Sequence, residues 1–298
     1  MQNQMYYQVA ENERVGLAVM REIDVTEIIE AVRQMSQTAN TDLGKDVIRA
    51  FERGQETEES STGKAIFKAL IENAMIARDE KVPMCQDTGF SVVFVDLGQD
   101  VHLVGGSLEA AINEGVRRGY EEGFLRKSIC DPFTRANTKD NTPAVVITQI
   151  VDGDRVKLTM APKGGGSENM ARVTMLTPSG GKKAVMDFIV QRCQEAGSNP
   201  CPPVIVGAAV GGTPEKAAIL AKRTLLREIG SQNPDPELAQ MEAELLTRIN
   251  NLGMGPQGLG GRNYALAVHL DKHPCHIATL PLAVQICCHA SRHKETIL

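Results

Sequence analysis

The segment Cys201-Pro202-Pro203-Val204-Ile205-Val206-Gly207-Ala208-Ala209-Val210 carries the clearest fold signal in this sequence. Two prolines lead into an unbroken run of apolar and small residues, which is typical of a buried strand. A helix is predicted directly after it, over residues 214–227, because Pro214 suits a first helical turn and Thr213 a cap. Together with the elements around it, this segment predicts a mixed α/β fold in which helices flank β-sheets.

The same alternation extends in both directions from this segment. Towards the C-terminus the pattern predicts a helix over 236–250 capped by Asp235, then strands over 264–270 and 276–286 joined by a polar turn at 271–274. Towards the N-terminus it predicts the following elements: a strand over 91–97, a helix over 108–119, a pair of strands over 144–151 and 155–161 turning at Gly153, and a helix over 182–196. Helices over 25–35, 43–51 and 64–77 predict a helical lobe within residues 1–80 of a single domain, 1–298.

The composition narrows the class of protein. At 298 residues the chain lies near the upper limit for one hydrophobic core. Its 42% apolar and 23% charged residues indicate a packed globular protein rather than a disordered one. The net charge of −5, without a basic stripe, argues against a nucleic-acid or anionic-membrane partner.

The cellular location follows from what the chain lacks. Residues 1–9 are polar and do not form a secretory signal, and no stretch approaches the roughly 18 apolar residues of a spanning helix. We therefore expect a cytoplasmic protein, whose cysteines are buried or bind metal rather than form disulfides. The chain has seven cysteines: Cys85, Cys130, Cys193, Cys201, Cys275, Cys287 and Cys288.

Three segments combine cysteine with unusual neighbours. Cys85 is followed by Gln86-Asp87-Thr88-Gly89, so a soft ligand lies beside an amide, a carboxylate and a hydroxyl, although a plain turn also explains this pattern. Cys201 lies on a support stiffened by Pro202 and Pro203, and a buried strand entry is the alternative. Cys287 and Cys288 point to opposite faces of an extended chain, so only one easily faces a shared site. Their wide spacing does not by itself identify a metal site.

Two glycine-rich loops add candidate polar contacts. The first, over residues 161–169, offers backbone amides and Lys163 to a carboxylate or phosphate, but it lacks the order of a Walker loop. The second, over residues 253–262, can place Gln257 and Arg262 near an anionic substrate, with His276 further along the chain. Loop geometry explains the glycines equally well, and a lone histidine is more often structural.

Taken together, these segments resemble the iron-sulfur class I fumarate hydratases and L-tartrate dehydratases, over nearly the whole chain. The resemblance is carried by these motifs: Cys85-Gln86-Asp87-Thr88-Gly89, Lys163-Gly164-Gly165-Gly166-Ser167-Glu168-Asn169, Cys201-Pro202-Pro203, Gly255-Pro256-Gln257-Gly258-Leu259-Gly260-Gly261 and Cys288-His289-Ala290-Ser291-Arg292-His293-Lys294-Glu295. In length the chain is similar to the separate alpha subunit of two-subunit forms. The resemblance therefore implies a beta subunit and a hetero-oligomer.

The resemblance also implies roles for particular residues. It assigns Cys85, Cys201 and Cys288 as ligands of a 4Fe-4S cluster, which leaves Cys130, Cys193, Cys275 and Cys287 as structural residues. It places the following residues around a dicarboxylate substrate: Gln86, Arg126 and Gly165 as binding residues, and Asp87 and His276 as catalytic residues. Asp87 is the expected proton donor or acceptor on this side, while the base that removes the carbon-bound proton is expected from the companion domain.

The reaction implied is the reversible hydration of fumarate to (S)-malate, with an open cluster iron acting as Lewis acid. The residues Ser167-Glu168-Asn169 after Lys163 favour fumarate, and L-tartrate is the alternative substrate. Two hypotheses of other classes remain at this stage: an iron-sulfur sensor or assembly subunit, and a zinc-binding structural module. The acidic and basic groups around Cys85 favour catalysis, because a sensor has no need to bind a dicarboxylate.

Overall fold

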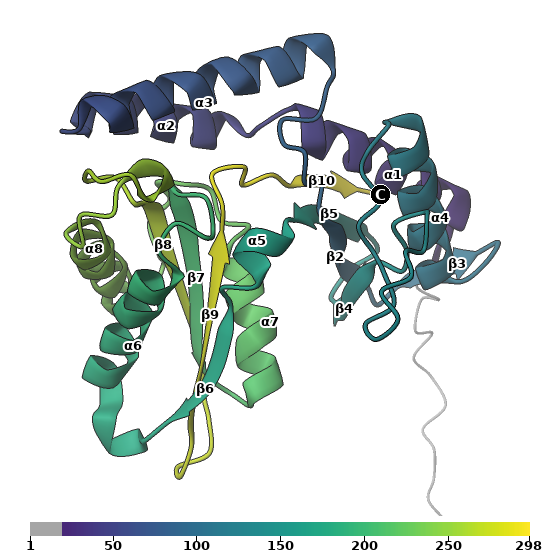
Figure 1. Ribbon diagram of the computed structural model, residues 1–298. Coiled ribbons are helices and arrows are strands. Elements are labelled where there is room, and N and C mark those ends of the chain that lie inside the picture. Colours follow the sequence, from purple (N-terminus) through teal and green to yellow (C-terminus); the bar gives the residue numbers. More distant parts are fainter. Residues whose placement is uncertain (1–19) are drawn as a thin grey trace, which may run out of the picture.

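A computed structural model describes residues 20–298 and confirms a mixed α/β fold in which helices flank three sheets (Figure 1). The predicted absence of a signal in residues 1–9 lies outside this range. The helices are α1 (Val25–Thr41), α2 (Lys45–Thr57), α3 (Ser61–Glu80), α4 (Leu108–Glu122), α5 (Gly165–Glu168), α6 (Gly181–Ala196), α7 (Pro214–Thr224) and α8 (Pro236–Asn250). The strands are β1 (Arg21–Asp24), β2 (Phe90–Gly98), β3 (Val101–Val104), β4 (Val145–Val151), β5 (Val156–Lys163), β6 (Arg172–Leu176), β7 (Val204–Gly211), β8 (Ala265–His273), β9 (Leu280–Cys287) and β10 (Lys294–Ile297).

The apolar segment at the centre of the sequence forms β7, one of the two inner strands of a four-stranded sheet with the order β6-β9-β7-β8, which we call the β7 sheet. Helices α6 and α8 cover one face of this sheet and α7 covers the other (Figure 1). Side chains alternate along the strand, so Val206 packs towards α6 and α8 while Ala209 packs towards α7. At Gly207 a Cβ atom would lie 2.5 Å from Thr224 Oγ1, so glycine allows α7 to approach the strand closely.

The two predicted helix caps have different outcomes. Asp235 caps α8 as predicted, since its carboxylate accepts hydrogen bonds from the backbone N–H groups of Glu237 and Leu238. Thr213 occupies the cap position of α7, but its side chain makes no capping hydrogen bond. Its hydroxyl instead hydrogen-bonds the Glu215 carboxylate, and this contact lowers the pKa of Glu215 after the larger effect of Glu215's own backbone N–H.

A second sheet has the order β10-β5-β2-β4 and corrects the predicted strand pair. The strands over 144–151 and 155–161 exist, and Gly153 turns between them with a φ of +101°. They do not pair with each other, because β2 lies between them, parallel to β4 and antiparallel to β5. The end of β2 fills the space that a hairpin would close: Gly98 donates to the carbonyl of Arg155 at 2.8 Å and Gln99 to that of Val151 at 2.8 Å.

The N-terminal helices pack in two different places. Helix α1 packs against α4, where Gly115 and Gly119 let the two helices approach closely. Helices α2 and α3 pair with each other and lie over one end of the β7 sheet (Figure 1). A third core joins them to residues of β7, β8 and β9, including Ile205, Ala267 and Cys287.

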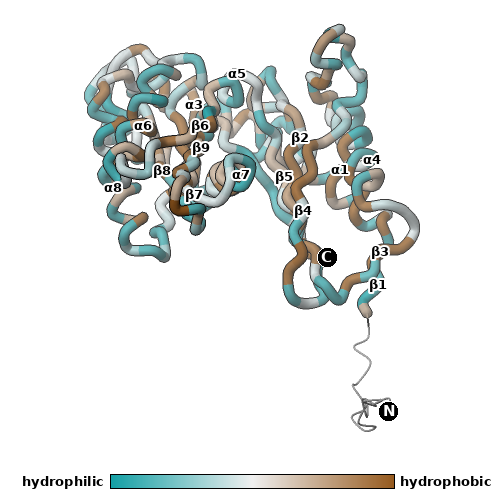
Figure 2. Tube along the Cα trace, turned by 90° about the horizontal axis from the view of Figure 1, so that it is seen from below, coloured by the Kyte–Doolittle hydropathy of each residue, from teal (hydrophilic) through white to brown (hydrophobic). Residues whose placement is uncertain are grey.

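The hydropathy of the strands agrees with this division into cores. Figure 2 shows the hydrophobic colour running along strands such as β2, and Val93 and Val95 of that strand are fully buried. Within residues 20–298, none of the helices has both the length and the apolar character needed to cross a membrane.

Candidate functional site

Three cysteines from distant parts of the chain lie at one end of the β7 sheet. Cys201 precedes β7 and Cys288 follows β9, and these antiparallel neighbours place Ile205 opposite Cys287 in register. Cys85 reaches the same place from the segment before β2, and its neighbour Met84 donates its backbone N–H to the carbonyl of Asn40 at 3.0 Å. Burial raises the pKa of the Cys201 thiol, and the nearby charges of Cys288, Cys85 and Asp87 raise it further.

The backbone around Cys201 is held on both sides. Its φ is +54°, an uncommon value for a residue with a side chain. Its N–H donates to the carbonyl of Ser198 at 3.0 Å, and its carbonyl lies 3.3 Å from the backbone nitrogen and 3.1 Å from the ring nitrogen Nδ1 of His289. His289 directly follows Cys288, so these contacts tie the segments of two cysteines together.

Asp87 links the Cys85 segment to the first glycine-rich loop. One carboxylate oxygen accepts from the backbone N–H of Gly89 and the other from that of Gly165, each at 2.9 Å. The backbone carbonyl of Asp87 accepts from the guanidinium group of Arg292. A Cβ atom at Gly164 would lie 3.1 Å from the same carboxylate, so glycine there leaves room for Asp87.

Backbone contacts also bring Arg126 beside this segment. The hydroxyl of the fully buried Tyr120 donates towards the carbonyls of Thr88 at 2.8 Å and Gly89 at 3.1 Å. The Thr88 hydroxyl donates to the carbonyl of Arg126 at 2.9 Å. The side chains of Arg126 and Gln86 are exposed, so both remain free to meet a ligand near Asp87.

The charged residues of the first glycine-rich loop face inward. Lys163 is only 4% exposed, and its ammonium group donates to the Ser167 hydroxyl at 2.7 Å and lies 3.4 Å from the Glu168 carboxylate. Glu168 also pairs with Lys222 of α7. Burial acts to raise the pKa of Glu168, but Lys163 and Lys222 together lower it. Lys163 is therefore used inside the protein, and the expectation that it binds an anion is wrong for this arrangement.

Side chains of the second glycine-rich loop, residues 253–262, also contact other parts of the protein. Gln257 donates its backbone N–H and its side-chain amide to the carbonyl of Pro202, at 2.8 and 2.6 Å. Arg262 forms an ion pair with Glu59 at 2.7 Å. A substrate role for either side chain therefore stays a prediction, and in the structure Gln257 holds the residue next to Cys201.

His276 lies far from Cys85, Cys201 and Cys288 of its own chain. Strand β8 runs parallel to β7, so its last residues lie at the opposite end of the sheet from Cys201. His276 follows in the exposed loop before β9, which begins only at Leu280 rather than at the predicted residue 276. Strand β7 has 8 residues, so the two ends of the sheet lie about 25 Å apart.

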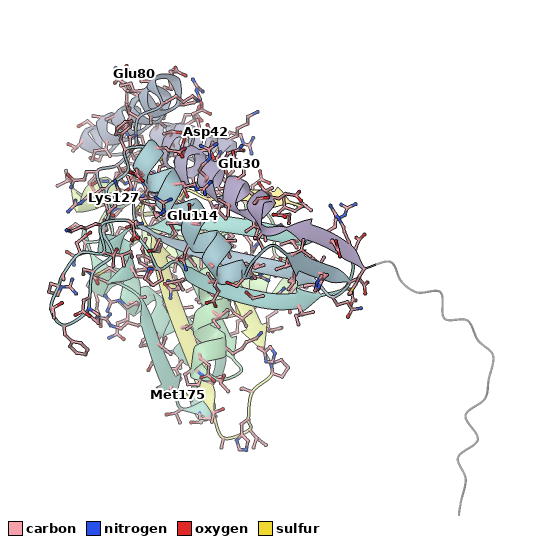
Figure 3. All side chains as sticks on the ribbon, turned by 90° about the vertical axis from the view of Figure 1, so that its right-hand side faces the viewer. Glu30, Asp42, Glu80, Glu114, Lys127 and Met175 are labelled. Atoms are coloured by element: carbon pink, nitrogen blue, oxygen red, sulfur yellow. The ribbon has the colours of Figure 1, made fainter. Side chains whose placement is uncertain are left out.

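Figure 3 marks the end of the molecule that carries the loop of His276. Met175, which lines a hollow together with His273, Cys275 and His276, lies near the lower end in this view, and Lys127, next to Arg126, lies in the upper part. The structure therefore brings together Cys85, Gln86, Asp87, Arg126, Gly165, Cys201 and Cys288, and leaves His276 apart.

The chemistry of the donor set is compatible with an iron-sulfur cluster. Within residues 20–298, no three His, Cys, Asp or Glu side chains are arranged to hold one metal ion. In a cubane cluster each thiolate binds a different iron. The three cysteines at this site are free thiols, which are the donors that such a cluster requires.

Arg292 also fits an iron-sulfur cluster at this place. The sequence analysis did not identify it as a site residue. It is 5% exposed, and its Nε and Nη1 atoms have no hydrogen-bond partner among the described residues. A buried guanidinium group normally requires an anionic partner. A cluster bound by three thiolates carries negative charge, so the surroundings of Cys288 fit such a group. The sequence shows Arg292 within its motif but gives no sign of its burial.

Comparison with known proteins finds similarity over most of the chain. Residues 29–297 match the sequence family Fumerase, described as "Fumarate hydratase (Fumerase)". The chain is 40% identical over 271 residues to a Methanocaldococcus jannaschii protein named "Putative L(+)-tartrate dehydratase subunit alpha", covering 89% of this chain and 95% of that protein. It is 33% identical over 278 residues to an Escherichia coli K12 protein named "L(+)-tartrate dehydratase subunit alpha", covering 92% of this chain and 91% of that protein.

Proposed function

The chain belongs to the fumarate hydratase (Fumerase) family and is a hydro-lyase, and on this premise we propose that it is the alpha subunit of an iron-sulfur enzyme that hydrates fumarate to (S)-malate reversibly. One observation carries the proposal: Cys85, Cys201 and Cys288 meet at one end of the β7 sheet beside the carboxylate of Asp87. The whole chain, residues 1–298, is proposed to act as one catalytic unit.

Cys85, Cys201 and Cys288 would hold a 4Fe-4S cluster. When bound, the cluster supplies a Lewis-acidic iron that makes a hydroxyl group of the substrate a better leaving group. Cys287 is a less suitable ligand, since it is a buried member of the core that joins α2 and α3 to the sheet, whereas Cys85 and Cys288 are only partly buried against that core. The other free cysteines, Cys130, Cys193 and Cys275, take no part in this set.

The chain's own residues would bind and orient the dicarboxylate. Arg126 and Gln86 are exposed beside Asp87, where a guanidinium group and an amide can hold a carboxylate. Gly165 keeps the Asp87 carboxylate in place with its N–H, which leaves Asp87 oriented to exchange a proton with the substrate's leaving oxygen. The base for the carbon-bound proton is proposed to come from a beta subunit, as the names of the relatives, both alpha subunits, support.

His276 can reach such a site only from a neighbouring molecule. Its position about 25 Å from Cys201, at the far end of β7, excludes a contact within the same chain. We therefore assign it to the site of another copy, in an assembly that brings the loop before β9 to the cysteine end of a second chain.

L-Tartrate is the second candidate substrate, because both relatives are named as tartrate dehydratase subunits. The sequence argument for fumarate weakens in the structure, since Lys163, Ser167 and Glu168 contact one another rather than open space. Fumarate remains the first choice because the matching family is described as fumarate hydratase. A sensor role does not account for membership of a hydro-lyase family, and a zinc module lacks a single-ion site within residues 20–298.

The test is anaerobic reconstitution with iron and sulfide, followed by assays with malate and L-tartrate, with and without a beta subunit. We expect brown protein with about four irons per chain that converts malate only with its partner. Conversion of L-tartrate alone would change the substrate and keep the mechanism. Failure of the wild-type chain to take up iron would refute the proposal.

Matched serine variants identify the ligands. Cys201→Ser should lose the cluster, whereas Cys275→Ser should retain it, although both cysteines are exposed. Cys85→Ser and Cys288→Ser should behave like Cys201→Ser, and equal iron content in Cys201→Ser and Cys275→Ser would contradict the assignment.

A further inference from the structure

Glu58 is a buried carboxylate that no part of the proposed reaction uses. It lies between α2 and α3 and is 1% exposed. Its oxygens accept hydrogen bonds from the backbone N–H groups of Glu59 and Ser60, at 2.9 and 3.0 Å. They also accept from the backbone N–H groups of Arg262, at 2.9 Å, and Asn263, at 2.8 Å, and from the side-chain amide of Asn263 at 3.1 Å.

These contacts anchor the second glycine-rich loop at its C-terminal end. The loop then turns back on itself, with Gly260 donating to the carbonyl of Met254 at 2.8 Å. Gly255 has a φ of +64°, and a Cβ atom there would collide with the carbonyl of Gly260. The loop is therefore a compact unit whose position is fixed from Glu58.

The opposite side of the loop hydrogen-bonds to the Cys201 segment and packs against it. Gln257, with a φ of +54°, directs both its backbone N–H and its side-chain amide at the carbonyl of Pro202. Gly258 lies against Ser198, where an added Cβ atom would come within 2.5 Å of the serine Cβ. Ser198 in turn accepts the N–H of Cys201. The loop thus touches the segment before and after the cysteine.

We propose that Glu58 and Gln257 are positioning residues for the cluster ligand Cys201, and that they act through the loop 253–262. This inference rests on the proposed function, because it requires Cys201 to bind iron. Groups that orient a metal ligand commonly change metal affinity by about 10–100-fold when they are removed.

The charge state of Glu58 supports this role. Burial alone would raise its pKa, but the hydrogen bonds from the backbone of Ser60, Asn263 and Arg262 and from the Asn263 side chain lower it to about 2. The carboxylate is therefore ionised at neutral pH. Glutamine has the same shape but offers an NH₂ group where Glu58 accepts hydrogen bonds, so Glu58→Gln should loosen the loop with little change in volume.

The test measures iron release from the reconstituted full chain to a chelator without oxygen, together with the electron paramagnetic resonance spectrum of the cluster after one-electron reduction with dithionite. Gln257→Glu removes the amide that donates to Pro202, and Glu58→Gln removes the anchor. We expect each variant to lose iron about 10-fold faster than the wild type and to show a broadened spectrum. The double variant should be no worse than the more affected single variant, because both act through one loop.

Glu242→Gln is the matched control. Glu242 is also buried, at 8% exposed, and accepts from the backbone N–H of Leu270 at 2.7 Å, towards the other end of β8. It should lower the unfolding temperature and leave iron release and spectrum unchanged. Iron release from Glu58→Gln and Gln257→Glu equal to that of Glu242→Gln would overturn the inference. Failure of the wild type to bind a cluster would instead overturn the proposed function.

Discussion

The carboxylate of Asp87 accepts two backbone N–H groups, from Gly89 and Gly165, at the junction of two loops. This arrangement fixes its direction beside Cys85. A proton-transfer group contributes most when its geometry is set before the substrate binds. Asp87 therefore combines a defined position with an acid–base function in the proposed reaction.

We predict that Asp87→Asn lowers kcat by about 100-fold or more, because asparagine cannot exchange the proton. The variant should keep its iron, since Asp87 is not a proposed ligand. Steady-state kinetics with malate and iron analysis on the same sample check both points. Asp79→Asn, on the exposed end of α3, is the control, and equal kcat values for the two variants would remove Asp87 from the mechanism.

Glu58 gives a prediction for stability as a function of pH. Its folded-state pKa of about 2 lies below the usual 4.5, so its contribution is present above about pH 5 and is lost as the pH falls towards 2. This difference corresponds to about 3 kcal/mol at neutral pH. In urea unfolding of the apo chain, the gap between wild type and Glu58→Gln should narrow from pH 6 to pH 3. A gap that stays constant would show that the Glu58 charge does not matter.

Glu58 also shows why some residues could not be predicted from the sequence. Its partners Arg262 and Asn263 lie more than 200 positions later, so no local pattern marks the contact. Cys85, Asp87 and Cys201 could be selected because each lies in an unusual local motif. Lys163 was selected for its glycine-rich neighbours, but its direction depends on Glu168 and on Lys222 of a distant helix.

At the scale of elements, helix α4 depends on close contact with α1. An added Cβ at Gly119 would lie 2.5 Å from the Cβ of Ser36, and one at Gly115 would lie 2.7 Å from that of Val32. Helix propensity alone favours alanine over glycine by about 1 kcal/mol. Here packing and propensity therefore predict opposite signs for the same substitution.

We predict that Gly119→Ala destabilises the chain by about 1–3 kcal/mol, because the added methyl group overpacks the α1–α4 contact. Ala110→Gly, at an exposed position of the same helix, should cost only about 0.5–1 kcal/mol. Urea denaturation followed by circular dichroism measures both. A Gly119→Ala variant more stable than the wild type would show that α1 moves aside freely.

The elements themselves could largely be predicted, but their neighbours could not. Residues 204–210 and 236–250 form β7 and α8 because an apolar run and a Pro-initiated, Asp-capped helix are local signals. The turn at Gly153 is also local, and it was correct. The insertion of β2 between β4 and β5 is a pairing across more than 45 residues, which no turn residue reports.

At the scale of the whole molecule, the β7 sheet has two chemically different ends. Three cysteines and Asp87 lie at one end, and His273, Cys275 and His276 surround a hollow at the other. The direction of β8, parallel to β7, makes this separation a property of the topology. His276 can therefore serve the cysteine end only from a second chain.

This arrangement predicts complementation between two inactive variants. Cys201→Ser lacks a cluster ligand, and His276→Ala lacks the imidazole, so each should be nearly inactive alone with the beta subunit. When the two chains are mixed under conditions that exchange subunits, some sites combine an intact cysteine set from one chain with His276 from another. For a symmetric pair with random exchange, about a quarter of the sites are complete, so about a quarter of wild-type activity should return. A mixture as inactive as its components, with mixed assemblies demonstrated by mass spectrometry, would remove His276 from the active site.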